Sequence, residues 1–157
     1  MQLSNFERLV QLADEVFASK NDPDQLDVNQ EVIERLKRIH PATVSEFDDG
    51  DGPVAWVLVI PTTNELMNQF IENRISEKEL FDLTPTDTTY NALYLCAALV
   101  LAEYRGKGIA KQLTLNAVEN IRKDHPLKAL FVWVFTKEGD LLSDSIARLT
   151  SLALLKR

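Results

Sequence analysis

The residues best suited to chemistry in this sequence stand together at 103–113, which read EYRGKGIAKQL. This junction lies between an apolar run and a helical pattern, and it gathers three basic residues and two glycines: Arg105, Gly106, Lys107, Gly108 and Lys111. A turn that feeds a helix presents unpaired backbone N–H groups at the helix start, where the helix dipole also favours negative charge. Glycine lacks a Cβ, so a bulky anion can approach the backbone. The junction therefore predicts a site for a phosphate or pyrophosphate group.

Two familiar phosphate motifs do not fit the junction. No glycine stands five residues before Gly106. After Gly108, Ile109 and Ala110 stand where a P-loop has Lys and then Ser or Thr. The spacing is not GxGxxG either. The alternative is a solvated helix start with ordinary surface lysines. We favour the phosphate site, because an apolar run precedes the junction and a second one follows the helix.

The other reactive side chains are isolated in the sequence. Cys96 lies inside an apolar run without a neighbouring base, which favours buried packing over a nucleophile. His40 and His125 each precede a proline at the end of a helical pattern, so they indicate turns, and their spacing predicts no metal site. The acidic stretch EFDDGDG at 46–52 is either an ordinary solvated turn or an attraction for a cationic acceptor.

Composition bounds the class of protein. A chain of 157 residues with 45% apolar and 26% charged residues suits one core, so we expect a single domain over 1–157. No run reaches the ~18 apolar residues of a membrane span and no signal-peptide pattern follows Met1, which predicts a cytoplasmic protein without a membrane partner. Residues 1–90 carry seven Lys or Arg against eighteen Asp or Glu. We expect no nucleic-acid partner, because such proteins show a larger basic footprint.

The periodicity of the apolar residues predicts the elements that position the junction. Helical spacing covers 4–19, 27–39, 106–123 and 139–155, and strands are indicated at 41–47, 53–61, 92–102 and 128–136. The first two strands flank a turn cluster and should form a hairpin. The run at 92–102 suits a strand covered on both faces, and a buried helix is the alternative. The order strand, helix, strand over residues 92–136 requires a crossover connection, so those two strands should lie parallel.

Residues 62–90 are interpreted as an insertion between strands. NELMNQFIENRI and SEKELFDL in this segment look helical, and TPTDTT looks like a loop. The aromatic residues Phe70, Phe81 and Tyr90 either cover an acceptor site or anchor the insertion on the core. Anchoring is favoured, since large aromatic side chains are usually buried.

The junction resembles the phosphate-binding signature of the GNAT acetyltransferase superfamily, which is arginine or glutamine, two residues, glycine, one residue, and glycine or alanine. Arg105, Gly108 and Ala110 match this pattern. The wider ALVLAEYRGKGIAKQL is similar to the end of the family's fourth strand and the start of its third helix, and the order of elements up to the FVWVFT strand is also similar. The resemblance implies an α+β, three-layer fold with a mixed, mostly antiparallel sheet and helices on both faces.

The resemblance also implies acetyl-CoA, or another acyl-CoA, as co-substrate. The pyrophosphate would bind the amides of the loop, and the pantetheine arm would lie along the fourth strand like an extra strand. Leu99 and Leu101 would offer main-chain groups to that arm. The residues implied to bind the cofactor are Leu99, Val100, Leu101, Arg105, Gly106, Lys107, Gly108, Ile109 and Ala110.

Acyl transfer to an amine needs a base for the amine proton, a stabilised oxyanion and a proton for the thiolate leaving group. Many family members use a tyrosine on the helix after the fifth strand as the acid, but 137–157 contain no tyrosine. The remaining catalytic candidates are Tyr94, Glu103 and Ser145, with Ser143 as an alternative to Ser145. Their ordinary roles would be core packing for the tyrosine, pairing with Arg105 for the glutamate and capping for the serine.

The sequence pattern ends in a helix, without the two strands that normally finish the family's sheet. The acceptor site is then either incomplete or completed by a second subunit of a homodimer. We therefore predict an N-acetyltransferase that passes an acetyl group from acetyl-CoA to a primary amine of a small molecule or protein, by direct attack in a ternary complex. The alternative is a non-catalytic acyl-CoA-binding or oligomerising module of the same fold.

Overall fold

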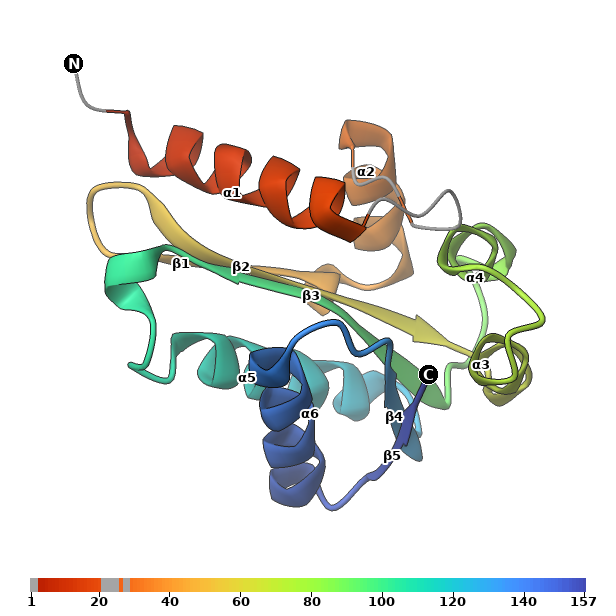
Figure 1. The fold of residues 1–157 in the computed structure, drawn as a ribbon. Coiled ribbons are helices and arrows are strands. Elements are labelled where there is room, and N and C mark those ends of the chain that lie inside the picture. The colour runs from red at the N-terminus through yellow and green to blue at the C-terminus, as the bar shows by residue number, and fades with distance from the viewer. Residues whose placement is uncertain (1–2, 21–25, 27–28) are drawn as a thin grey trace.

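The computed structural model describes residues 3–20, 26 and 29–157, and within 17–20 it describes the backbone alone. These residues form a five-stranded sheet with helices on both faces (Figure 1). The helices are α1 (Asn5–Lys20), α2 (Gln30–Ile39), α3 (Asn64–Ile71), α4 (Glu77–Leu83), α5 (Ile109–Asp124) and α6 (Lys137–Thr150), with short 3-10 turns η1 (Pro41–Thr43) and η2 (Ala102–Tyr104). The strands are β1 (Val44–Asp48), β2 (Pro53–Thr62), β3 (Ala92–Val100), β4 (Ala129–Val132) and β5 (Ala153–Lys156).

The sheet is mixed, with the strands in the order β1-β2-β3-β4-β5. The β1–β2 and β2–β3 pairings are antiparallel and are the longer ones, whereas β3–β4 and β4–β5 are short parallel pairings. This arrangement agrees with the expected α+β class. The predicted hairpin, and the parallel pairing of the two strands on either side of the crossover helix, are both confirmed.

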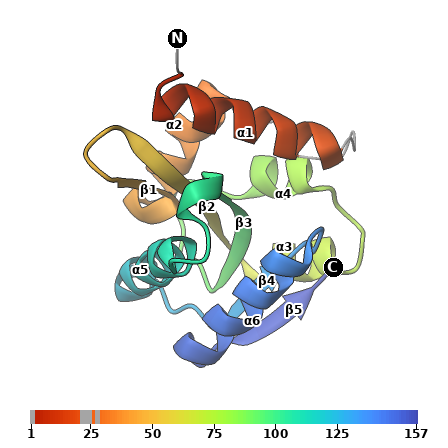
Figure 2. The ribbon, with the colours of Figure 1, turned by 60° about the vertical axis from the view of Figure 1, so that its left-hand side comes forward.

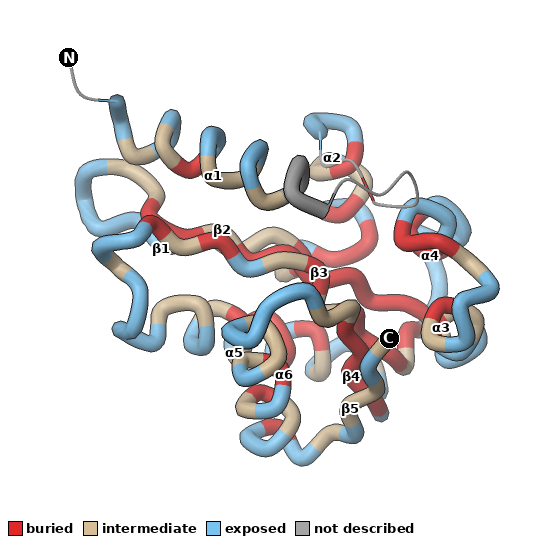
Figure 3. The backbone as a smooth tube through the Cα atoms, viewed as in Figure 1, coloured by how far each residue is buried: buried red, intermediate tan, exposed pale blue. Residues whose placement is uncertain are grey.

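Two apolar layers enclose the sheet. On one face, α2, α3 and α4 pack against β2, β3 and β4, and α1 extends this layer over β2 and β3. On the other face, α5 and α6 pack against the same central strands through a second cluster that includes Val118, Ile121 and Ile146. Figure 2 shows the helices on opposite sides of the sheet, and Figure 3 shows that the buried residues concentrate in β2, β3 and β4. The central strands are thus covered on both faces, as their unbroken apolar sequences indicate.

Local chemistry explains where several helices begin and end. Ser4 Oγ accepts the N–H of Glu7 (3.1 Å) and caps α1. α2 ends at Ile39, just before Pro41, which cannot continue a helix. Residues 27–28 of the second predicted helix lie outside the described residues.

The 62–90 segment has the two predicted helices, α3 and α4, followed by a loop. A capping box at Ser76 starts α4, since Ser76 and Glu79 bond each other's backbone N–H groups. Phe70, Phe81 and Tyr90 are buried, with at most 4% of their surface exposed. The prediction that they anchor the segment on the core is therefore confirmed.

The C-terminal part of the sequence prediction was wrong in two places. The strand expected over 128–136 ends at Val132, and the chain from Trp133 to Thr136 turns away from the sheet into α6. The helix expected over 139–155 ends at Thr150, because Ser151 adopts the left-handed conformation (φ 58°) that terminates a helix. The following residues form β5, so the chain returns to the sheet instead of ending in a helix.

Candidate functional site

The sheet opens between β3 and β4. These strands pair only from Ala92 to Tyr94, and β3 then continues to Val100 along an edge where the described residues provide no paired strand. Within β3, Leu58 of β2 pairs with Ala97 and Val59 pairs with Leu95, so Cys96 is an extra residue in a β-bulge. A bulge bends its strand and increases the twist. It lies just beyond the last residue of the β3–β4 pairing, where the two strands separate.

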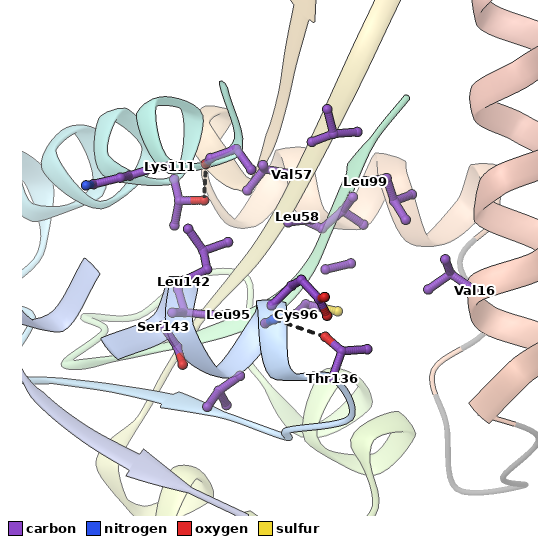
Figure 4. Close-up of a pocket in the computed structure, with 18 of the residues that line it drawn as sticks. Val16, Val57, Leu58, Leu95, Cys96, Leu99, Lys111, Thr136, Leu142 and Ser143 are labelled. Atoms are coloured by element: carbon purple, nitrogen blue, oxygen red, sulfur yellow. Dashed lines mark hydrogen bonds between the residues drawn. The ribbon is translucent and has the colours of Figure 1, made fainter. Parts of the chain in front are cut away.

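A cavity of about 620 Å³ occupies this opening. That volume lies within the ~300–1,000 Å³ typical of small-molecule sites. Its walls come from β3, from 132–136 after β4, from the junction and the start of α5, from the first turns of α6, and from α1. Figure 4 shows Val16 of α1 and Lys111 of α5 on opposite sides, with β3 between them. The cavity therefore passes between the strands and is lined from both faces of the sheet.

The junction at one end of the cavity has the backbone geometry that a glycine loop requires. Gly106 and Gly108 have φ values of 76° and 79°, a conformation that L-residues with a Cβ rarely adopt. A Cβ added to either residue would meet no atom within 4 Å, so conformation, not crowding, favours glycine there. Gly108 is the N-cap of α5, and no described side chain caps the first N–H groups of this helix. Gly108, Ile109 and Ala110, at this helix start, line the cavity.

Positive charge surrounds the junction. Arg105 and Lys111 line the cavity, and no described carboxylate forms an ion pair with either of them. Arg105 Nε donates to the Val100 carbonyl at the open edge of β3 (3.0 Å). Lys107 lies with its Nζ over the Tyr104 ring, 5.3 Å from the centroid, and is not among the residues that line the cavity.

Two contacts hold η2 and the junction in place. Arg8 of α1 donates hydrogen bonds from Nη1 and Nη2 to the Glu103 carboxylate, at 2.5 and 2.7 Å, and these bonds lower the pKa of Glu103 to about 2. Tyr104 O–H donates to Asp49 in the β1–β2 turn, which lowers the pKa of Asp49 and raises that of Tyr104. Glu103 therefore pairs with Arg8, not with Arg105, and it does not line the cavity. Its predicted role as a base is not supported.

Tyr94 has its ordinary role, core packing, and not the catalytic role that was its alternative. Its side chain is 1% exposed and does not line the cavity, and its O–H donates to Oε2 of Glu77 (2.5 Å), at the start of α4. Burial, with the adjacent Glu77 as a second cause, raises the pKa of Tyr94 well above its usual value. Glu77 Oε1 accepts the N–H of Leu26 (2.8 Å). The pair is a buried link between α4, β3 and the chain at Leu26.

The serine candidates on α6 have structural partners or lie off the cavity. Ser145 does not line it. Ser143 lines it, but its hydroxyl donates to the Asp140 carbonyl (2.8 Å) one helical turn earlier. Glu138, in the first turn of α6, is the one carboxylate among the described residues that line the cavity. Sequence reasoning missed Glu138, because its position at a helix start resembles ordinary dipole compensation.

The residues that present main-chain groups at the open edge of β3 differ by one position from two of those expected. Leu101 N–H donates to the Val54 carbonyl of β2 (2.9 Å) and does not line the cavity. Backbone groups of alternate residues point to the same edge, so those of Leu99 also face β2. The main-chain groups of Ala98 and Val100 face the open edge instead. Val100 remains from the predicted set, and Ala98 replaces Leu99 and Leu101.

Sequence reasoning also missed the wall contributed by α1 and by the chain after β4. Leu12 and Val16 of α1 line the cavity together with Trp133 and Phe135. The two aromatic rings contact each other, with centroids 4.5 Å apart. A signal for this wall exists in FVWVF, because residues two apart in an extended chain lie on the same face.

A comparison with models of known protein families and with curated protein sequences finds no match for this chain. In the part of the chain that the structure describes, no helix is long and apolar enough to cross a membrane. The same residues contain no group of three or more His, Cys, Asp or Glu side chains arranged to hold a metal ion.

Proposed function

We propose that the protein binds an acyl-CoA in the opening between β3 and β4 and transfers the acyl group to a primary amine. The observation that carries the proposal is the combination of the open β3 edge with a glycine-rich, basic helix start at one end of the same cavity. A CoA molecule needs both features, since it has an anionic pyrophosphate and a pantetheine arm with amide groups.

The loop suits the pyrophosphate. The start of α5 lines the cavity without a side-chain cap, and its helix dipole adds to the charge of Arg105 and Lys111. Glycine at 106 and 108 leaves the backbone accessible. The main-chain groups of Ala98 and the N–H of Val100 then offer hydrogen bonds to the amides of the pantetheine arm, while the Val100 carbonyl accepts Arg105 Nε.

In the transfer itself, the amine nitrogen attacks the thioester carbonyl, the C–N bond forms and the C–S bond breaks. The nitrogen loses one proton to a base through water, and the CoA sulfur receives one proton. Glu138 is the lining carboxylate available to accept the amine proton, and backbone N–H groups of β3 suit the oxyanion. No side-chain nucleophile is needed.

Calorimetry with CoA and acetyl-CoA tests the proposal. Arg105→Glu and Gly108→Asp should each weaken binding at least about tenfold, because each places a negative charge beside the pyrophosphate. The matched controls are Lys128→Glu, which reverses an exposed charge beyond the far end of α5, and Gly50→Asp. Gly50 also has a positive φ (110°) and open space around it, but lies in the β1–β2 turn. Absence of binding at millimolar CoA, or equal losses in variants and controls, would refute the proposal.

A non-catalytic acyl-CoA-binding module is the second candidate. It is favoured by one observation, that Tyr94, Glu103 and Ser145 all lie outside the cavity lining. Thioester turnover with a panel of primary amines separates the two functions. Turnover that falls with the loop variants, and that falls in Glu138→Gln without loss of CoA binding, would exclude the non-catalytic reading.

A further inference from the structure

The end of the cavity that faces α1 differs in chemistry from the end at the junction. Six apolar side chains form it, and we call them the apolar end: Leu12, Val16, Leu58, Leu99, Trp133 and Phe135. Leu12, Val16 and Leu99 belong to the cluster under α1, which also includes Tyr104 and Ile109 of the junction. Leu58 and Trp133 belong to the neighbouring cluster on the same face. In Figure 4, Val16 and Leu99 lie on the side away from Lys111.

Among the described residues, no carboxylate belongs to the apolar end. Among the described residues that line the whole cavity, Glu138 is the one carboxylate, and it belongs to α6 on the opposite face of the sheet. The acidic turn at 46–52 does not line the cavity. Asp48 accepts the N–H groups of Gly50 and Gly52, and Asp49 accepts the Tyr104 hydroxyl, so these carboxylates serve the turn and the junction. An attraction of a polycationic acceptor by this turn has no support in the geometry.

Phe135 is exposed to solvent at the apolar end of the cavity. Its side chain is 46% exposed although it lines the cavity and contacts Trp133. An exposed aromatic ring at the mouth of an apolar cavity gains hydrophobic free energy when an apolar group covers it. The same argument applies to Leu12 and Val16, which are only half-buried on α1.

We propose that the apolar end binds an apolar group about the size of an aromatic ring or a short alkyl chain. The inference rests on the proposed function for one step: if the junction holds the pyrophosphate, the thioester lies near the bulge at Cys96, beside Leu58, which pairs with Ala97, and the apolar end receives the apolar group attached there. That group belongs either to the acyl chain of the thioester or to the body of the amine. The chemistry of the subsite is the same in both cases.

Fluorescence of Trp133 reports on this subsite directly. In a Trp56→Phe background, Trp133 is the remaining tryptophan. We expect 2-phenylethylamine to change its emission in a saturable way, and spermidine at the same concentration to leave it unchanged. For the acyl arm, hexanoyl-CoA should bind at least about tenfold more tightly than acetyl-CoA if the chain is the occupant, since each buried CH₂ contributes about 0.8 kcal/mol. Whichever arm responds identifies the source of the apolar group.

Phe135→Ala is the test variant, and Phe47→Ala is its matched control. Both rings are exposed to a similar extent, 46% and 41%, but Phe47 does not line the cavity. We expect the apolar preference to fall about tenfold in Phe135→Ala and to remain in Phe47→Ala. Leu12→Asp, compared with Val10→Asp on the same helix, is a second pair, with circular dichroism confirming that both fold.

The outcomes separate this inference from the proposed function. If CoA fails to bind but the phenylethylamine response persists and is lost in Phe135→Ala, the proposed function fails and the apolar subsite stands. If CoA binds through the junction, but 2-phenylethylamine changes the Trp133 emission no more than spermidine does and hexanoyl-CoA binds no more tightly than acetyl-CoA, the subsite is refuted and the function stands. Equal effects of Phe135→Ala and Phe47→Ala would also refute the subsite.

Discussion

The buried hydrogen bond between Tyr94 and Glu77 gives a sharp test of what holds β3 to α4. Tyr94→Phe removes one hydroxyl and keeps the ring, so it opens no large cavity in the core. The Glu77 carboxyl is 0% exposed, and its Oε2 loses its hydrogen-bond donor, which lies at 2.5 Å. A buried polar group left without a partner costs about 1–3 kcal/mol. We therefore expect Tyr94→Phe to lower the free energy of unfolding by about 2 kcal/mol.

Urea unfolding at pH 7, followed by tryptophan fluorescence, measures this change. Tyr104→Phe is the matched control, because it makes the same chemical change at a hydroxyl on the protein surface, where water replaces the lost partner. We expect an effect below about 0.5 kcal/mol there. In a double-mutant cycle with Glu77→Gln, the two changes should be coupled by about 1–2 kcal/mol.

The reasoning is refuted if Tyr94→Phe and Tyr104→Phe destabilise the protein equally while the slope of the unfolding free energy against urea concentration stays the same in both variants. A zero coupling energy in the cycle would equally show that the hydroxyl and the carboxyl do not interact in solution. In either case Tyr94 would again be available as a chemical group, and its role in the cavity would have to be reconsidered.

Three further predictions address the junction and His125. The carboxyl carbon of Glu103, followed by NMR, should titrate with a pKa of about 2, and Arg8→Ala should return this pKa toward ~4.3. Because the pKa is lower in the folded state, the Arg8–Glu103 pair stabilises the fold at pH values above the unfolded-state pKa, and this stabilisation is lost as the pH falls toward 2. Burial, and then the charge of His40, lower the pKa of His125, so the urea midpoint should fall as the pH drops below about 6.5, and the fall should be smaller in His125→Gln. Gly108→Ala should destabilise the protein by about 1 kcal/mol in urea unfolding because φ is 79°, whereas Gly108→Asn, which tolerates this conformation better, should cost less; equal costs would contradict the conformational argument.

The sequence predicted elements well where the signal is local. The junction was placed correctly between a strand and a helix, because glycines end the apolar run and Ile109 starts a four-residue apolar period. The two helices of the 62–90 segment were predicted for the same reason. The C-terminal seven residues were not, since SLALLKR fits both a helical and a strand pattern and only pairing with β4 decides between them.

The roles of the candidate catalytic residues depended on contacts that no local pattern contains. Glu103 and its partner Arg8 are 95 positions apart in the chain, and Tyr94 and Glu77 lie on different elements. Such partners are determined by tertiary packing, so the residue type alone suggested a base and an acid where the structure has an ion pair and a buried hydrogen bond. The bulge at Cys96 likewise has no signature in ALYLCAALV, although it lies where the sheet opens.

The stretch FVWVFT shows how one sequence signal served two structural purposes. Its β-branched and aromatic residues predicted a long strand, yet β4 ends at Val132 and the next four residues leave the sheet. Had the strand continued, it would have paired with β3 beyond Tyr94 and closed the edge at Ala98 and Val100. Because it leaves, Trp133 and Phe135 line the cavity, and Trp133 also packs against Phe70 in the core. The side chains that made the strand prediction confident are therefore those that the apolar end of the site requires.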